Sequence, residues 1–390
     1  MRRVVECAAL ALAALCCIAA APPPVPVAEG LDVATLAPAT PRRLYLWDVA
    51  WNHAKDGRVW VADGDTLAFK GMIPAAFYAN FLVDPKGRWD AVAETIWTRG
   101  NRGDRQDLLT LYDPATLTIT AEIPLPSRAL VSTKRPDADV SADGRYVYVY
   151  DSEPAGSVKV VEPDARQVAA TIEVPGCTLV YAWGNRGFAS LCYDGSLASV
   201  TFDGAMKPAI THTAPFNAPE TDPVFEHSPT DRERGVAWFI SYAGQVYLAK
   251  LGPNPIVQKP WSIAATAGLP TPGMDLQRKL WRPGGWQLAA LHKGDDHLFV
   301  LMHEGAAWTH KETGTEVWEL DAGRQTLVRR IKLATPANSI AVTQEAKPLL
   351  YTLAETTGTL TAIDLATGKV LHQDKTLGDD GYLLMTVEGE

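Results

Sequence analysis

The chain has 390 residues, a length that allows one large all-β domain, one α/β barrel, or two to three smaller domains. Hydrophobic residues make up 47% and charged residues 21%, which is enough apolar material for a folded core and excludes wholesale disorder. The formal net charge is −9, so the chain has no basic surplus for binding a nucleic-acid backbone.

The first 21 residues have the features of a cleaved export signal. Arg2 and Arg3 give a positive start, Cys7 to Ala20 is an almost unbroken apolar run, and Ala19-Ala20-Ala21 offers a small-residue cleavage site. The apolar run is short for a membrane span, and no later segment is long enough to provide one. The sequence therefore predicts a secreted protein without a transmembrane segment.

Removal of this leader would change the formal charge from −9 to −10 and leave two of the five cysteines, Cys177 and Cys192. In an oxidising compartment two remaining thiols most simply form one disulfide. A metal-binding pair and a reactive thiol are the alternatives. The sequence near the two cysteines lacks the further His or Cys ligands that zinc would need.

Residues 22–42, which follow the leader, are rich in proline and alanine. Such a segment does not pack as a helix and is typical of an extended arm or linker. It is interpreted either as a loose terminus or as an arm that clasps another subunit.

Residues 43–390 contain a recurring unit, in which a β-strand ends at an anchor residue and a short turn leads into a second strand. Asp113-Pro114 shows why the turn forms, because the Asp side chain can bond the following backbone and proline fixes φ. The clearest copy is Ile363 to Lys369. The seven anchors are Asp63, Asp113, Glu162, Asp203, Leu251, Asp321 and Asp364.

The spacing of these anchors, between 41 and 70 residues, is close to the period of propeller blades. Turns at 84–88 and 141–145 would supply the other hairpin of a blade. The longest step contains a Pro- and Gly-rich insertion at about 253–285, expected to be a long loop on one face. An array of β-sandwiches is the alternative, but a closed ring has no exposed edges. The sequence therefore predicts an all-β, seven-bladed β-propeller.

Motifs that carry chemistry are absent: there is no phosphate-binding glycine loop, nucleophile elbow or H-E-x-x-H. His292, His297, His303 and His310 lie close together in sequence, but their spacing does not place two ligands on one face of a strand or helix. Asp295-Asp296 is interpreted as a charged hairpin turn. No catalytic residue and no metal site are predicted on this chain.

Two aromatic clusters are candidates for an interface with another protein. The first is a loop that contains Trp281, Arg282 and Trp286, and the second follows a β-strand and contains Trp308 and His310. Trp and Arg are favoured as interface anchors because they bury a large area for little lost entropy. The alternative is packing between blades, where tryptophan also fills space well.

With these motifs the sequence resembles the heavy (large) subunit of the quinoprotein amine dehydrogenases, methylamine dehydrogenase most closely and aromatic amine dehydrogenase next. The resemblance covers nearly the whole chain after the leader. The stretches that carry it are 281–287 (WRPGGWQ), 308–311 (WTHK), 347–351 (KPLLY), Gly71-Met72-Ile73 followed by Phe77, 113–117 (DPATL), and Cys177 and Cys192 with their neighbours.

The resemblance implies a propeller in a periplasmic heterotetramer of two heavy and two light subunits. In the family a tryptophan tryptophylquinone cofactor and the catalytic Asp belong to the small, Cys-rich light chain. Electrons from amine oxidation then pass to a blue-copper protein of the amicyanin or azurin type. This chain would carry no cofactor, and its expected partners are the light chain, a second heavy subunit and the copper protein.

The resemblance also assigns roles to residues of this chain. Cys177 and Cys192 match the single heavy-chain disulfide, and Phe77 matches a Phe at the mouth of the substrate channel that helps to select amine size. The residues expected at the light-chain interface are Trp281, Arg282, Trp286, Trp308 and His310. The surroundings of Phe77 (74–76 and 78–81) and the loop before Trp281 depart from the family pattern, which leaves the preferred amine and the docking surface open.

Two other functions are weighed against an amine dehydrogenase subunit. One is a stand-alone periplasmic propeller that binds a ligand or a protein. The other is an enzyme with its own active site in the propeller channel, for which the sequence shows no acid–base or metal constellation.

Overall fold

The computed structural model describes residues 34–48, 54–130, 133–354, 357–377, 383–387 and 389. The predicted leader, 1–21, and residues 22–33 of the predicted arm lie outside this part of the chain. Within it almost all regular structure is β-strand, with a 3-10 turn, η3 (Arg135–Asp137), and one short helix, α2 (Ile263–Thr266). No helix among the described residues is long and apolar enough to cross a membrane.

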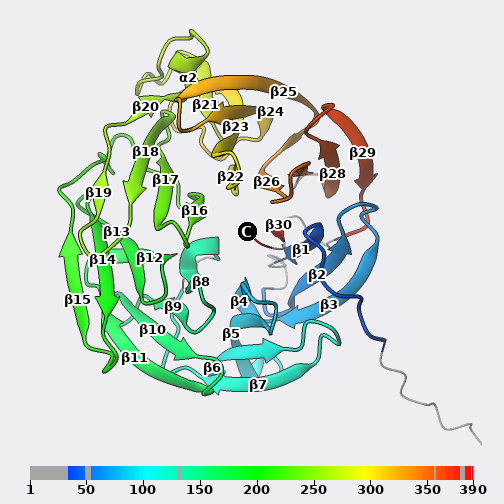
Figure 1. The fold of residues 1–390 in the computed structure, drawn as a ribbon, viewed down its shortest axis with the longest axis vertical. Helices are drawn as coiled ribbons and strands as arrows, with labels where there is room; N and C mark the ends of the chain where they lie inside the picture. Colours follow the sequence, from blue (N-terminus) through cyan, green and yellow to red (C-terminus); the bar gives the residue numbers. More distant parts are fainter. Residues whose placement is uncertain are drawn as a thin grey trace, which may run out of the picture. The chain divides into compact units, whose positions relative to one another are not determined.

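The described strands form seven sheets around a central axis, which confirms the predicted seven-bladed propeller (Figure 1). From the innermost strand outward, blade 2 contains β4 (Phe77–Val83), β5 (Asp90–Arg99), β6 (Arg102–Tyr112) and β7 (Ile119–Pro124). Blade 3 contains β8 (Ala138–Val140), β9 (Val147–Asp151), β10 (Ser157–Glu162) and β11 (Gln167–Glu173). Blade 4 contains β12 (Cys177–Trp183), β13 (Gly187–Cys192), β14 (Leu197–Phe202) and β15 (Pro208–His212).

Blades 5 to 7 follow the same order with small additions. Blade 5 contains β16 (Thr230–Asp231), β17 (Val236–Ile240), β18 (Gln245–Lys250) and β19 (Ile256–Val257), and β20 (Trp261–Ser262) also pairs with β18. Blade 7 contains β26 (Ser339–Val342), β27 (Leu349–Ala354), β28 (Thr359–Asp364) and β29 (Lys369–Asp374). In blade 6, β21 (Leu280–Pro283) and β22 (Ala289–His292) both pair with β23 (His297–Gly305), which is followed by β24 (Gly314–Asp321) and β25 (Thr326–Ala337). The innermost strand of blade 6 is thus split into two pieces.

Blade 1 is built from both ends of the described chain. The N-terminal part supplies β1 (Arg43–Asp48), β2 (Gly57–Asp63) and β3 (Phe69–Ala75), and the C-terminal β30 (Leu383–Val387) pairs with β1 as the innermost strand. The pairing is antiparallel, from Leu44 opposite Val387 to Asp48 opposite Leu383. This pairing of the two ends of the chain gives blade 1 its innermost strand and closes the ring.

Each of the seven sequence anchors lies at the turn between the third and fourth strands of one blade. At Asp113, for example, Oδ1 accepts hydrogen bonds from the backbone N–H of Ala115 (2.8 Å) and Thr116 (2.9 Å). Four residues after the anchor, the backbone turns left-handed in five of these turns. Those residues are Leu67, Leu117, Arg166, Gln325 and Gly368. A local turn chemistry therefore repeats around the ring.

The predicted insertion at 253–285 contains β19, β20 and α2 before the chain enters β21. Figure 1 shows α2 outside the ring of strands, next to β20 and β21. Ser262 caps the helix, since its hydroxyl accepts a hydrogen bond from the N–H of Ala265. The insertion is therefore more ordered than the long loop that was expected.

Several tryptophans fill the space within and between blades, as the packing interpretation predicted. Trp318 has no exposed surface and belongs to the largest buried cluster, which joins blades 5, 6 and 7. Trp47, Trp89 and Trp238 are also buried, at 2%, 5% and 4% exposure. Burying side chains of this size supplies much of the hydrophobic stabilisation of such a core.

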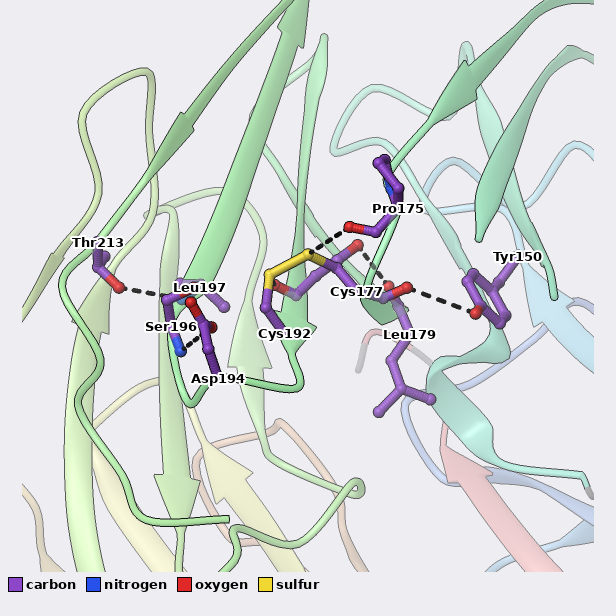
Figure 2. The surroundings of a disulfide bond; sticks show 10 residues. Tyr150, Pro175, Cys177, Leu179, Cys192, Asp194, Ser196, Leu197 and Thr213 are labelled. Atoms are coloured by element: carbon purple, nitrogen blue, oxygen red, sulfur yellow. Dashed lines mark hydrogen bonds between the residues drawn. A yellow bond between two sulfur atoms is a disulfide. The ribbon is translucent and has the colours of Figure 1, made fainter. Parts of the chain in front are cut away.

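The predicted disulfide between Cys177 and Cys192 is present, with an S–S distance of 2.05 Å. The two residues face each other across β12 and β13, so the bond cross-links a hairpin (Figure 2). The Tyr150 hydroxyl donates to the carbonyl of Cys177 at 3.4 Å and joins the bonded hairpin to blade 3. His212 lies close to both sulfurs, but sulfurs held in a disulfide are not thiolate ligands for a metal.

We predict that replacing both cysteines by serine lowers the free energy of unfolding by about 3 kcal/mol, because the bond closes a loop between residues 15 apart. The measurement is urea unfolding monitored by tryptophan fluorescence. The wild-type protein kept reduced by dithiothreitol is the control and should unfold at the same urea concentration as the double variant. Equal midpoints for oxidised wild type and the variant would contradict the prediction.

Candidate functional site

The ring has two distinct faces, defined by the direction of the innermost strands. Radial repetition makes these strands run in one sense, and the bridge between Gln287 and Ser339 of neighbouring blades is parallel. We name the face at which the innermost strands begin the upper face, and the face at which they end the lower face. Phe77 begins β4, Trp286 precedes β22, and the β23–β24 loop turns at the upper face.

Phe77 lies at the upper face in a bulged part of β4. The pairing of β4 with β5 shifts register between Phe77 and Asn80, and Tyr78 adopts a left-handed conformation with φ of 46°. In a regular strand neighbouring side chains point to opposite faces, whereas here the rings of Phe77 and Tyr78 lie 4.1 Å apart. Trp97 packs edge-on against Phe77 at 5.6 Å.

A buried arginine holds this bulge from below. Arg128 is 1% exposed and donates hydrogen bonds to the carbonyls of Phe77 and Tyr78 and, at 2.7 Å, to Oδ1 of Asn80. Burial lowers the pKa of Arg128 to about 10, which still leaves the side chain charged at neutral pH. The energetic cost of this burial is offset by the carbonyl and amide oxygens around the guanidinium.

Glu94, on β5, supports the residue before Phe77. Its Oε2 accepts a hydrogen bond from the N–H of Ala76 at 2.8 Å, and its Oε1 accepts one from the hydroxyl of Thr110 at 2.6 Å. Burial raises the pKa of Glu94. The backbone on both sides of the Phe77 ring is therefore fixed by buried polar side chains.

The second aromatic region of the upper face surrounds the β23–β24 loop. Trp308 is 46% exposed, has φ of 66°, and packs edge-on against Tyr242 at 6.0 Å. His310 stacks on Tyr242 at 4.0 Å and lies 6.3 Å from Phe225. The indole of Trp308 is thus partly exposed to solvent and rests on Tyr242, on which His310 also stacks.

Trp286 is held between this region and the opposite side of the ring. Its backbone N–H donates to the carbonyl of Asn338 at 2.7 Å, and the ammonium of Lys311 lies 4.9 Å from the centre of its ring. The indole also packs against a buried cluster of blades 1 and 2 that contains Tyr45 and Phe81. This residue therefore links the interior of the ring to the Trp308 loop.

Arg282 is buried inside blade 6, and its neighbour Trp281 is partly buried. Arg282 is 2% exposed and donates to the carbonyls of Gly305, at 3.1 Å, and Gly273. Trp281 packs against Trp318 at 5.4 Å, below the guanidinium of Arg330. Arg282 therefore holds together two loops beside Trp308, so any contribution of its side chain to an interface is indirect.

The four histidines that are close in sequence have different partners. His292 bonds Asp295 and His297 bonds Glu319, both at 2.7 Å, whereas His303 bonds the hydroxyl of Thr309. His310 stacks on Tyr242 as described above. The fold therefore uses each of them in a separate local contact.

A cavity of about 500 Å³ lies along the axis and is lined by innermost strands and by loops of the lower face. Three of its carboxylates are engaged by arginines: Asp84 by Arg88 at 2.7 Å, Asp139 by Arg232 at 3.5 Å, and Glu345 by Arg42 at 2.7 Å. His227, which also lines it, has its pKa lowered to about 3 by burial. The Asp84–Arg88 pair lies within the β4–β5 loop, whereas the other two pairs join different segments of the chain, so these three carboxylates serve as structural ion pairs.

Comparison with known proteins identifies the family. Residues 40–388 match the model of the methylamine dehydrogenase heavy chain family. The chain belongs to this family.

Named relatives agree with this assignment. The methylamine dehydrogenase heavy chain of Paracoccus versutus is 31% identical over 350 residues, which cover 88% of this chain and 79% of the relative. That of Methylobacillus flagellatus is 28% identical over 400 residues, which cover 98% of this chain and 97% of the relative.

Solved structures support the fold alone. A dihydro-heme d1 dehydrogenase superposes with a TM-score of 0.54 at 16% identity, covering 94% of this chain and 76% of that one. A protein of unknown function from Desulfotomaculum acetoxidans gives a TM-score of 0.56 at 12% identity, covering 87% and 98%. These identities are too low to transfer an activity.

For this heavy chain, the sequence named Phe77 and Trp308 as candidate site residues, which stay predictions, but it did not reveal the residues that hold them. Arg128, Glu94 and Trp97 carry no motif, and Tyr242 is far from Trp308 in sequence. The signal that could have suggested the Phe77 bulge is weak. It is a run of three aromatic residues within five positions at 77–81, too many for regular in–out alternation.

His303 makes the loop that carries Trp308 sensitive to acid. Burial, with a further contribution from the nearby Arg282 guanidinium, lowers the pKa of His303 to about 4. Because its pKa is about 6.5 when unfolded, the unfolded chain binds the proton more readily. The stability due to neutral His303 is therefore complete above about pH 6.5 and is lost as the pH falls towards 4.

We predict that His303→Gln flattens the dependence of stability on pH between pH 4.5 and 7.5, by up to about 3 kcal/mol across this range. The measurement is the free energy of urea unfolding at pH 4.5, 5.5, 6.5 and 7.5. His212→Gln, at an exposed position, is the control and should leave the wild-type slope unchanged. The same slope in wild type and His303→Gln would show that His303 is not responsible.

Proposed function

We propose that the chain is the heavy, non-catalytic subunit of a periplasmic amine dehydrogenase that converts primary amines to aldehyde and ammonia. The observation that carries the proposal is the family match across residues 40–388. In this assembly a small light chain bears the quinone, a second heavy subunit completes a heterotetramer, and a blue-copper protein of the amicyanin or azurin type receives the electrons.

Two features of the chain support secretion into the periplasm. The predicted leader at 1–21 would direct export. The disulfide between Cys177 and Cys192 is of a kind that persists in oxidising compartments and is rare in the cytosol.

Trp281 and Trp318 pack together with ring centres 5.4 Å apart, and Trp318 is fully buried in the blade core, so packing accounts for this pair. The proposal places the tryptophan tryptophylquinone on the light chain, as the resemblance to the quinoprotein amine dehydrogenases implies. The chemistry that such a quinone supplies is a two-electron oxidation of the amine.

The residues of this chain have supporting roles in the proposal. The exposed Trp308, on its base of Tyr242 and His310, is the anchor for the light chain, and Trp286 and Lys311 extend the contact towards the axis. Phe77, at the upper face and fixed by Arg128, lies at the mouth of the route by which amine reaches the quinone. Its ring limits the size of amine that can pass.

Purification of the native protein separates this proposal from a stand-alone binding propeller. The expected result is a small copurifying subunit with quinone absorbance and amine-dependent reduction of a redox dye. A colourless, single-chain protein that reduces no dye with any primary amine would contradict the proposal.

We predict that Trp308→Ala weakens the binding of the light chain by about 30-fold, as expected for the loss of an interface tryptophan. The measurement is the dissociation constant of the reconstituted complex, by surface plasmon resonance. Phe69→Ala is the matched control, since Phe69 is a comparably exposed aromatic residue (53%) on the outermost strand β3. Equal affinities for wild type and Trp308→Ala would place the interface elsewhere.

We predict that Phe77→Ala in the reconstituted enzyme shifts substrate preference towards bulkier amines, because the ring no longer narrows the channel mouth. The quantity to compare is the ratio of kcat/KM for methylamine to kcat/KM for a phenylalkylamine. A single methylene in an apolar site can change such a ratio about tenfold or more, so the loss of a phenyl ring should be readily measured. An unchanged ratio would exclude Phe77 from size selection.

A further inference from the structure

The β5–β6 hairpin extends above the rest of blade 2 at the upper face. β5 has 10 residues and β6 has 11, whereas their neighbours β4 and β7 have 7 and 6. Phe77, the first residue of β4, is paired with Thr95, so the part of β5 beyond Thr95 has no partner in β4. Trp97 lies on this extension, opposite Arg105 of β6.

Trp97 contacts two groups from different blades. Its ring meets the ring of Phe77 at 5.6 Å and an interplanar angle of 72°, the edge-to-face geometry that aromatic pairs prefer. The ammonium of Lys55, in the β1–β2 loop of blade 1, lies 3.6 Å from the centre of the same indole. Lys55 also donates a hydrogen bond to the carbonyl of Asn101 at 3.1 Å, at the tip of the β5–β6 hairpin. The lysine thus holds the indole and the hairpin at once.

The Phe77 ring borders a cavity of about 160 Å³, which is also lined by Tyr78, Thr95, Arg128 and neighbouring residues. A cavity of roughly 150 Å³ is large enough to hold a benzene molecule. Tyr78, which lies 4.1 Å from the Phe77 ring, itself lines this cavity, whereas Trp97 does not, so loss of Trp97 would leave the phenyl ring room to turn into the cavity. The Arg128 hydrogen bonds fix the backbone of Phe77 and Tyr78 but do not fix the torsion angles of the Phe77 side chain.

We propose that Trp97 is a positioning residue for the Phe77 ring and that Lys55 keeps Trp97 in place by its cation–π contact. The size limit for the amine is then a property of the Lys55–Trp97–Phe77 stack, which spans blades 1 and 2, and not of Phe77 alone. The inference rests on the proposed function, in which Phe77 limits access to the quinone.

The test uses the reconstituted heavy–light complex and the ratio of kcat/KM for methylamine to kcat/KM for a phenylalkylamine. Trp97→Ala should lower this ratio by about threefold to tenfold, because it removes one of the two aromatic contacts of the Phe77 ring and leaves only Tyr78 beside it. Trp97→Phe, which keeps an aromatic edge beside Phe77, should restore most of the wild-type ratio. Lys55→Met, at an exposed loop position, should shift the ratio in the same direction by a smaller factor, about twofold.

Trp60 provides a matched control in blade 1. It packs edge-on against Phe69 at 5.6 Å and lies beside the guanidinium of Arg58, which makes a similar stack of cation, indole and phenyl ring. The stack is on β2 and β3, in the outer half of blade 1. Trp60→Ala should therefore leave the ratio at its wild-type value.

The outcomes separate this inference from the proposed function. If the wild-type complex oxidises amines but Trp97→Ala and Lys55→Met both keep the wild-type ratio, the positioning role is wrong and the proposed function stands. An equal shift in Trp60→Ala would also overturn the role, because the effect would then be a general loss of packing. If the wild-type complex oxidises no amine, the proposed function and the inference fall together.

Discussion

The pairing of β30 with β1 is the constraint on which the rest of the structure depends. A single blade cannot bury both of its apolar faces by itself, so each blade needs a neighbour on both sides. The last strand meets this need for blade 1 by joining it from within, which closes the ring. Once the ring is closed, every blade is packed between two neighbours around the axis. Loops from distant parts of the sequence then lie next to each other on the two faces.

The upper face shows what this closure achieves. Lys55 and Trp97 come from neighbouring blades, and the ammonium of Lys55 lies over the indole ring of Trp97. Trp286 of blade 6 packs against a hydrophobic cluster of blades 1 and 2. Polar contacts also join elements at this face: the buried Asn80 donates to the carbonyl of Lys134 at 2.8 Å, and the partly exposed Lys134 pairs with Glu226 from the segment that precedes blade 5. Asn80 is also bonded to Arg128, which fixes the backbone of Phe77 and Tyr78.

The lower face is organised differently, by arginine–carboxylate pairs that join adjacent blades. Arg88 of blade 2 reaches Asp164 of blade 3 at 2.9 Å, and Arg234 of blade 5 reaches Asp296 of blade 6 at 2.6 Å. These pairs are partly exposed and each is worth little alone. Their repetition suits a structural role for this face, whereas the proposed function places recognition at the upper face, which carries the exposed Trp308 and the contact between Phe77 and Trp97.

The sequence by itself determined the repeat, because most turns between the third and fourth strands are specified locally. At five of the seven anchors an aspartate accepts hydrogen bonds from the backbone amides that follow it. The even spacing revealed the other two anchors, Glu162 and Leu251, and the Cys177–Cys192 pair followed by elimination once a leader was assumed. What only the tertiary structure decided is which side chain of a motif faces solvent. Arg282 and Trp308 read alike as interface residues, yet one is buried and the other exposed, since burial depends on loops that are far away in sequence. The support of Phe77 by Trp97 was hidden for the same reason, because it requires a bulge at Tyr78 and a hairpin that extends beyond its neighbours. The conformation of a turn depends on a few neighbouring residues, whereas the position of an aromatic side chain is set by contacts across the closed propeller.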